Sequence, residues 1–149
     1  MVSFLIAYAS WSGNTQEVAE LVEETLLREG MDVTVHRIGL GPVPDPRQFD
    51  AMIVGSFTWD KGATPDEVKD FVLDVGYKPD NVYVFGTGDT QFGGDELFCN
   101  AAVKLAKFYA SRMAPLKIEQ SPRGAQEQTV IDWAKGVLQQ WKHSHALKC

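Results

Sequence analysis

A short segment near the start of the chain carries hydroxyl and amide groups in a pattern suited to binding a phosphate. Ser10-Trp11-Ser12-Gly13-Asn14-Thr15 lies between an apolar run that predicts a strand and an amphipathic run that predicts a helix. The first N–H groups of a helix lack intrahelical acceptors, and the helix dipole adds roughly half a positive charge there. A phosphate therefore docks at such a turn without Lys or Arg, and the segment contains neither.

Two further polar segments follow apolar runs, and each contains an aromatic residue. One extends from Ser56 to Gly62 and includes Thr58, Trp59, Asp60 and Lys61. The other extends from Thr87 to about Glu96 and includes Gly88, Asp89 and Phe92. Aromatic rings stack on flat ligands, and glycine allows close backbone approach. Together with the hydroxyl-rich segment, these segments predict a site for a planar, phosphorylated ligand.

Apolar runs that predict strands alternate with amphipathic runs that predict helices, which is typical of a parallel sheet built from βαβ units. Residues 4–8, 51–55 and 82–86 are continuously apolar, as in strands covered by helices on both faces. Residues 33–38 and 116–119 mix polar and apolar side chains, as edge strands do. We therefore expect an α/β fold, a three-layer sandwich with a five-stranded parallel sheet in the order 2-1-3-4-5.

Apolar stripes at helical spacing predict the helices that cover this sheet. They run through residues 18–26, 68–72, 102–109 and 130–141. Thr64 as N-cap, Pro65 at the first helical position and Glu67 predict the start of the second helix through a capping box. The prolines of the linker 39–46 predict an irregular segment or a short turn in place of a crossover helix.

In a doubly wound sheet, ligands bind beyond the carboxyl ends of the strands, where the strand order reverses. In the expected order this point lies between the first and third strands, which lead into the segments beginning at Ser10 and Ser56. The segment beginning at Thr87 follows the adjacent fourth strand. We therefore expect the three polar segments to meet at one edge of the sheet.

Length and composition set the broad class of the protein. The chain has 149 residues, 44% of them apolar, which fits a single domain over residues 1–149. A net charge of −6 disfavours nucleic acid and anionic membranes as partners and fits a basic protein partner. No apolar run approaches the roughly 20 residues of a membrane span and no signal-peptide pattern is present, so we expect a cytoplasmic protein. We also expect it to be a monomer. Cys99 and Cys149 have no CxxC or metal-site spacing and are expected to be free thiols.

The three polar segments together resemble the motifs of the short-chain flavodoxins, and the resemblance covers essentially the whole chain. Residues 10–15 look like the family's T/S-x-T/S-G-N-T phosphate loop. Gly55-Ser56-Phe57-Thr58-Trp59 looks like its second flavin loop, and Gly86-Thr87-Gly88-Asp89 followed by Phe98-Cys99 looks like its third, G-x-G-D…F-C. The resemblance implies FMN as a non-covalently bound cofactor.

The resemblance also assigns each segment to a part of FMN. The phosphate would be bound by Ser10, Ser12, Asn14 and Thr15. Trp59 would stack on one ring face, and the main chain of residues 87–89 would lie near the pyrimidine edge. The expected cofactor-binding set also includes Trp11, Gly13, Ser56, Thr58, Asp60, Lys61, Gly62 and Phe92. Trp11 is otherwise expected to be an exposed loop aromatic.

The implied function is that of a low-potential one-electron carrier with no substrate turnover of its own. Its partners would be a flavodoxin or ferredoxin reductase and redox acceptor enzymes. An acidic surface near the flavin would suit a basic reductase, and its candidate residues are Asp66, Glu67, Asp70, Asp95 and Glu96. Acidic residues also favour helix starts, so a plain solvated role for them stays open.

The chain departs from the family pattern near both expected ring contacts. Family members often have Gly directly after the Trp, where a peptide flips so that its carbonyl accepts a hydrogen bond from N5 of the reduced flavin. This chain has Asp60 and Lys61 there, and Asp tolerates positive φ less well, so the neutral semiquinone should be less favoured than with Gly. Phe92 stands where Tyr commonly stacks, in a segment longer than the family pattern.

Other functions on this fold stay open to different degrees. Residues 88–93 are similar to the G-N-x-N-F-G loop of the flavodoxin-like activator of dimanganese ribonucleotide reductase, although both Asn positions differ. A flavin-dependent reductase would need a substrate or nicotinamide domain, for which the chain has little room. A phosphoryl-accepting receiver domain is disfavoured, because Ser10 and residues 56–58 stand where its acidic residues would be.

Overall fold

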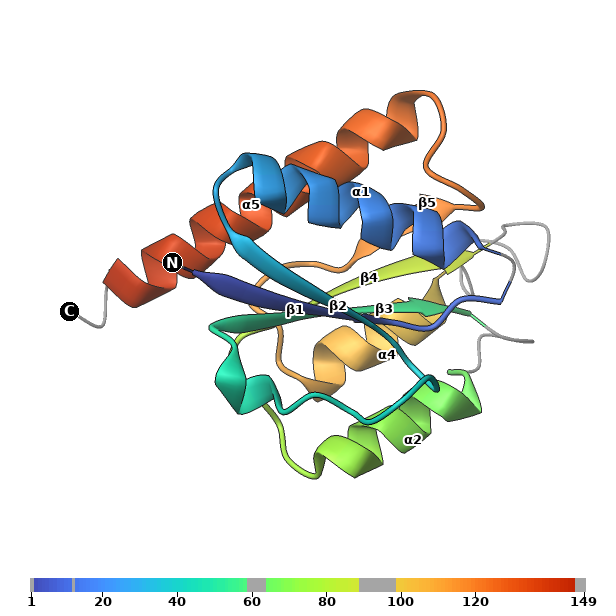
Figure 1. Ribbon diagram of the computed structural model, residues 1–149. Coiled ribbons are helices and arrows are strands. Elements are labelled where there is room, and N and C mark those ends of the chain that lie inside the picture. The colour runs from blue at the N-terminus through green and yellow to red at the C-terminus, as the bar shows by residue number, and fades with distance from the viewer. Residues whose placement is uncertain (1, 12, 59–63, 89–98, 147–149) are drawn as a thin grey trace.

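A parallel sheet of five strands forms the centre of the computed structural model, in the order β2-β1-β3-β4-β5 (Figure 1). The structure describes residues 2–11, 13–58, 64–88 and 99–146. Its elements are β1 (Ser3–Tyr8), α1 (Asn14–Arg28), β2 (Asp32–Arg37), β3 (Ala51–Phe57), α2 (Asp66–Val75), β4 (Val82–Gly88), α4 (Asn100–Phe108), β5 (Leu116–Glu119) and α5 (Ala125–Ala146). The strand order and parallel pairing confirm the fold expected from the sequence.

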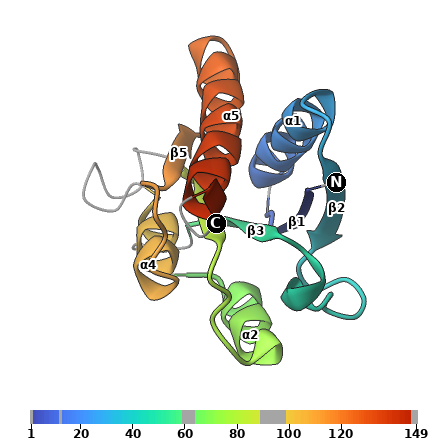
Figure 2. The ribbon, with the colours of Figure 1, turned by 90° about the vertical axis from the view of Figure 1, so that its left-hand side faces the viewer.

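Helices cover both faces of the sheet and make a core on each. α1 and α5 lie on one face, and α2 and α4 lie on the other (Figure 2). Phe4 and Phe85 share a core with α1 and α5, whereas Leu5 and Val54 share one with α2 and α4. Because successive side chains of a strand point to opposite faces, a continuously apolar strand fills both cores.

The central strands extend beyond their apolar runs. β1, β3 and β4 are almost fully buried, and β2 and β5 are partly exposed, as predicted. β3 continues through Ser56 and Phe57, and β4 through Thr87 and Gly88, because Ser56 pairs with Gly86 and Phe57 with Thr87. The second and third polar segments therefore begin within the sheet, and strand pairing fixes their first residues.

Gly86 allows α4 to pack closely on β4. A Cβ atom at this position would lie 2.6 Å from the Cβ of Ala102 on α4 and 3.2 Å from the carbonyl oxygen of Ser56. The first separation is well below carbon–carbon contact distance, so a larger residue would push the helix away. The glycine thus holds α4 against the strand that ends at Gly88.

The start of α2 differs from the predicted capping box. The helix begins at Asp66, and Pro65 is its N-cap rather than its first helical residue. Pro65 has an extended ψ of 143°, and its carbonyl oxygen accepts the N–H groups of Val68 (3.0 Å) and Lys69 (3.2 Å). No side-chain hydrogen bond among the described residues caps the helix, so the prediction of Thr64 as N-cap is wrong by one residue.

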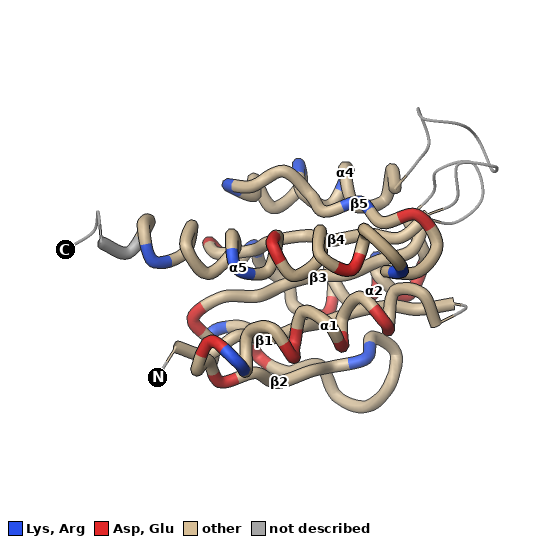
Figure 3. Tube along the Cα trace, turned by 90° about the horizontal axis from the view of Figure 1, so that it is seen from above, with Lys and Arg blue, Asp and Glu red and all other residues tan. Residues whose placement is uncertain are grey.

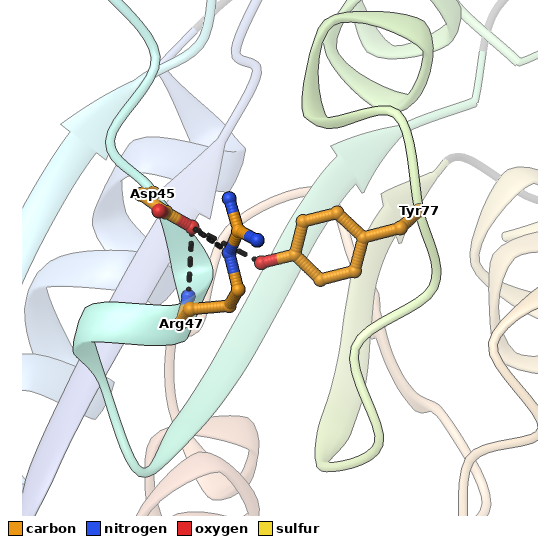
Figure 4. Close-up of polar contacts among 3 residues, drawn as sticks. All are labelled: Asp45, Arg47 and Tyr77. Carbon is orange, nitrogen blue, oxygen red and sulfur yellow. Dashed lines mark hydrogen bonds and ion pairs between the residues drawn. The ribbon is translucent and has the colours of Figure 1, made fainter.

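The proline-rich linker 39–46 between β2 and β3 contains no crossover helix, as predicted, and it ends in a short 3₁₀ turn, Pro46–Gln48. Oδ1 of Asp45 accepts the backbone N–H of Arg47 (3.0 Å), Nε of Arg47 (3.2 Å) and the hydroxyl of Tyr77 (3.1 Å) (Figure 4). Hydrogen bonds from Arg47 are the main cause of the lowered pKa of Asp45. These contacts brace the linker against the α2–β4 connection, at the amino-terminal edge of the sheet.

Candidate functional site

The carboxyl ends of β1, β3 and β4 meet at one edge of the sheet, and backbone hydrogen bonds join the segments that leave them. The N–H of Ala9 donates to the carbonyl oxygen of Gly55 (3.0 Å), and the N–H of Thr58 donates to that of Thr87 (3.2 Å). β1 and β3 are neighbours, yet the chain leaves them toward opposite faces, to α1 and to α2 (Figure 1). This edge is therefore the switch point at which a ligand is expected.

The turn between β1 and α1 presents backbone N–H groups to this edge. Gly13 is the N-cap of α1 with φ 95°, a left-handed conformation that favours glycine. The hydroxyl oxygen of Ser10 accepts the N–H groups of Gly13 (3.1 Å) and Gln16 (3.4 Å). No hydrogen bond among the described residues uses the N–H groups of Asn14 and Thr15. These groups are available to an anion at the positive end of the helix dipole.

A buried pair of hydroxyls joins this turn to the end of β4. The Oγ1 atoms of Thr15 and Thr87 lie 2.7 Å apart, and the residues are 1% and 3% exposed. One hydroxyl donates to the other, so the second still has a hydrogen to donate. The pair therefore fixes the first turn of α1 against β4 and supplies one further donor.

A basic side chain reaches the same turn from the neighbouring strand. Arg37 ends β2, and the parallel register places it beside Tyr8, the last residue of β1. Its Nη2 donates to the carbonyl oxygen of Ser10 (3.3 Å), and its Nη1 donates to Oε1 of Gln16 (3.4 Å). The turn itself holds no basic residue, as the sequence shows, but the sequence analysis did not identify Arg37 as a basic residue beside it. Arg37 could have been found by pairing the two expected strands in register, because both have six residues and their last residues lie side by side.

Two predicted site residues have roles within the fold. Ser56 is fully buried in β3, where its hydroxyl donates to the carbonyl oxygen of Phe57 (2.7 Å). This hydrogen bond occupies the donor of the Ser56 hydroxyl, and the cofactor contact of Ser56 stays a prediction. Oγ1 of Thr58 accepts the N–H of Ala101 (3.2 Å) and so connects the second polar segment to α4. Trp11 is 73% exposed, as expected for a loop aromatic.

The other predicted contacts fall mostly outside the described residues. Gly88 is the last residue of β4, and its carbonyl oxygen accepts the N–H of Gln120 (2.7 Å). The predicted contacts that lie outside the described residues are Ser12, Trp59, Asp60, Lys61, Gly62, Asp89 and Phe92. The same holds for Asp95 and Glu96 of the predicted acidic surface.

The described residues form neither a reactive thiol nor a metal site at this edge. Cys99 is a free thiol, as predicted, and it lies fully buried in the core, where burial raises the pKa of the thiol to about 12. Within the described ranges, no group of three or more His, Cys, Asp or Glu could hold a metal ion, and no helix is long and apolar enough to cross a membrane. A pocket of about 220 Å³ lined by Arg47, Tyr77 and Asn81 lies at the opposite edge.

Comparison with known proteins places this geometry in a family. The model of the family described as Flavodoxin matches residues 6–133. The chain belongs to the flavodoxin family. Probable flavodoxin 2 of Bacillus subtilis is 33% identical over 146 residues, which cover 91% of this chain and 93% of the relative. The structure of oxidised flavodoxin 2 from Bacillus cereus has a TM-score of 0.80 at 30% identity, covering 93% of this chain and 99% of that one.

A second solved flavodoxin structure has a similar fold over the same share of the chain. The flavodoxin of Streptococcus pneumoniae TIGR4 has a TM-score of 0.82 at 27% identity, covering 93% of this chain and 99% of that one. Flavodoxins are FMN-binding electron-transfer proteins, not enzymes that turn over a substrate. The turn of this flavodoxin fits the phosphate of FMN, because it offers hydroxyl donors and the N–H groups of Asn14 and Thr15, for which the described residues provide no acceptor.

Proposed function

We propose that this flavodoxin carries single electrons from a reductase to acceptor enzymes, using FMN bound non-covalently at the switch point between β1 and β3. The main support is the first turn of α1, where no described group accepts the N–H groups of Asn14 and Thr15. FMN, when bound, accepts and releases electrons one at a time. The protein holds the cofactor in place and sets the electrostatic field around it.

The phosphate end of the proposed site is formed by Ser10, Ser12, Asn14 and Thr15. The oxygen of Ser10 accepts two N–H groups, which leaves its own O–H to donate to the phosphate. The free hydrogen of the Thr15–Thr87 pair is a second hydroxyl donor. Gly13 makes the arrangement possible, because its φ of 95° turns the chain so that the next N–H groups face outward.

The ring end of the proposed site is formed by the segments that follow β3 and β4. We assign Trp59 to one ring face, Phe92 to the other, and the main chain of residues 87–89 to the pyrimidine edge. The hydrogen bonds of Thr58 to Thr87 and Ala101 position the residue directly before Trp59. The remaining lining is assigned to Trp11, Asp60, Lys61 and Gly62.

Flavin binding tests the cofactor assignment. The protein freed of flavin should bind one FMN per chain, with quenching of flavin fluorescence, and should bind riboflavin more weakly because riboflavin has no phosphate. Trp59→Ala should weaken the binding of both flavins by about 1 to 3 kcal/mol. The control is Trp133→Phe, which changes an indole packed on Phe85 within the fold. An unaltered dissociation constant for Trp59→Ala would remove the stacking assignment.

A reductive titration without oxygen tests the carrier function. Two separate one-electron steps in the visible spectrum, with slow reaction of the reduced protein with oxygen, are the expected result. A single two-electron step with rapid oxidation by oxygen would instead favour an activator of dimanganese ribonucleotide reductase.

The acidic start of α2 is the proposed docking surface for a basic reductase. Asp66, Glu67 and Asp70 are exposed, and this end of α2 follows the second polar segment at the carboxyl edge of the sheet (Figure 3). Neutralising all three (D66N, E67Q, D70N) should slow reduction by the reductase at low salt and flatten its salt dependence. The control neutralises three exposed carboxylates at the opposite edge, Glu29, Asp32 and Asp80. Equal slowing by both triple variants would show an effect of net charge alone.

A further inference from the structure

We infer that Arg37 is the counter-charge for the phosphate of the bound flavin, held beside the phosphate turn by two hydrogen bonds and contributing to affinity through its charge. The inference rests on the proposed function, because it assigns the ligand phosphate to the first turn of α1. It adds a residue from an edge strand to a site that otherwise consists of backbone N–H groups and hydroxyls.

The first step is the position of the guanidinium. Nη2 donates to the carbonyl oxygen of Ser10, within the turn, and Nη1 donates to the amide oxygen of Gln16, in the first turn of α1. Nε2 of Gln16 donates to Oε1 of Glu20 at 3.1 Å, which orients the amide with its oxygen toward Arg37. A long, exposed side chain is thus held at two points beside the helix N-terminus.

The second step is the charge. Arg28 pairs with Glu24 and Arg47 with Asp45, whereas Arg37 forms no ion pair with another described residue. Both hydrogen-bond acceptors of Arg37 are neutral oxygens, a backbone carbonyl and an amide. No described carboxylate therefore pairs directly with the guanidinium, since Glu20 is separated from it by the Gln16 amide, and its charge adds to the positive potential of the helix dipole.

The third step is the size of the effect. The guanidinium contacts Ser10 and Gln16, which flank Asn14 and Thr15 in the chain, so an anion on the N–H groups of Asn14 and Thr15 would lie about one to two helix turns from it, roughly 5 to 10 Å. This separation is close to the Debye length of about 10 Å at 0.1 M salt, so screening is partial. For a partly exposed pair, removal of the charge should weaken FMN binding about three- to tenfold.

A purely structural role for Arg37 gives a different expectation. If the side chain only tied β2 to the turn, its loss would disturb the turn for any ligand and would not depend on ligand charge. FMN and riboflavin share the same ring system, and only FMN carries the phosphate. The ratio of their dissociation constants therefore isolates the electrostatic contribution.

The experiment measures FMN and riboflavin binding to the flavin-free protein by fluorescence quenching at about 0.1 M salt. Arg37→Gln should weaken FMN binding about three- to tenfold and leave riboflavin binding unchanged, and Arg37→Lys should retain most of the FMN affinity. The difference between wild type and Arg37→Gln should shrink as salt is raised. Thermal unfolding of the flavin-free variants checks that each is folded.

The matched control is Arg28→Gln, which removes the same charge from the other end of α1. Arg28 lies 14 residues along the helix from Asn14, about 20 Å away, which is well beyond the screening distance. It should leave both flavin affinities at the wild-type value. Equal loss of FMN and riboflavin binding in Arg37→Gln, or an Arg37→Lys variant that behaves like Arg37→Gln, would overturn the inference. Failure of the wild-type protein to bind FMN would instead overturn the proposed function.

Discussion

The buried hydroxyl pair of Thr15 and Thr87 gives a quantitative test of how the phosphate turn is held. The two Oγ1 atoms are 2.7 Å apart, and both residues are almost completely buried. Thr87→Val should leave the Thr15 hydroxyl without its partner, and an unsatisfied buried hydroxyl costs about 1 to 3 kcal/mol. Thr15→Val should destabilise the protein by a similar amount for the same reason.

The double variant is the informative one. With both hydroxyls replaced by methyl groups of the same shape, no polar group is left unpaired, and the loss should be well below the sum of the two single variants. The free energy of unfolding would be measured by urea denaturation of the flavin-free protein, because bound flavin would add stability by mass action. With a urea slope of about 1 to 3 kcal/mol per molar, the single variants should lower the midpoint by about 1 M.

A second pair of variants controls for the removal of any buried hydroxyl from α1. Thr25 is buried on the same helix, but its hydroxyl donates to the carbonyl oxygen of Leu21 (2.8 Å) rather than to Thr87. Thr25→Val combined with Thr87→Val should therefore show additive losses. Additive losses for Thr15→Val and Thr87→Val as well would refute the hydroxyl bridge between α1 and β4.

The remaining predictions concern the core, the pH dependence and the redox potential. Gly86→Ala should lower the free energy of unfolding by about 1 to 3 kcal/mol, and Ala102→Gly should recover part of that loss in the double variant, both measured by urea denaturation. Burial lowers the pKa of His36 below its ordinary value of 6.5. As the pH falls, the unfolded chain therefore binds a proton at His36 before the folded chain does. The contribution of His36 to the free energy of unfolding is complete above pH 6.5 and is lost as the pH falls through the lowered pKa. His36→Phe should flatten that decline in unfolding free energy, and an unchanged profile would exclude His36 as its source. Lys61→Glu should lower the potential for uptake of the second electron, which a redox titration would show; an unchanged or raised value would contradict the assignment of Lys61 to the ring end.

Hydrophobic patterning was sufficient to predict the sheet, because each central strand is buried on both faces and each edge strand on one. The continuous run through Ile53 and Val54 and the mixed run through Thr34 and Val35 differ for this physical reason. Strand ends were harder to predict. Ser56 and Thr87 are polar and read as loop residues, yet backbone pairing with the adjacent strands keeps both within the sheet. Backbone hydrogen bonds do not depend on side-chain polarity, so composition gave no signal for them.

The helix starts show a related limit, since local sequence rules compete with backbone geometry. Thr64 and Pro65 match a capping signature, but Pro65 adopts ψ 143° and itself precedes the helix. At α1 the N-cap is Gly13, whose φ of 95° leaves no capping side chain of its own, and Ser10 supplies the capping oxygen from three residues earlier. A residue-type rule that searches for Ser, Thr or Asp at the N-cap position does not identify either start.

Arg37 depends on information of another kind, the register between two strands that are far apart in sequence. Nothing near Ser10 along the chain indicates a positive charge, and the edge position of β2 makes an exposed arginine unremarkable by itself. Parallel pairing of Tyr8 with Arg37 brings the two strand ends to the same level, so the side chain that leaves β2 last reaches the turn that leaves β1. β2 is the edge strand beside β1, so a residue at the end of β2 can bring a charge to the β1–α1 turn without any change in the sequence of the turn. A basic residue at that position would change the field at the proposed phosphate site and would leave the backbone N–H groups of the turn as they are.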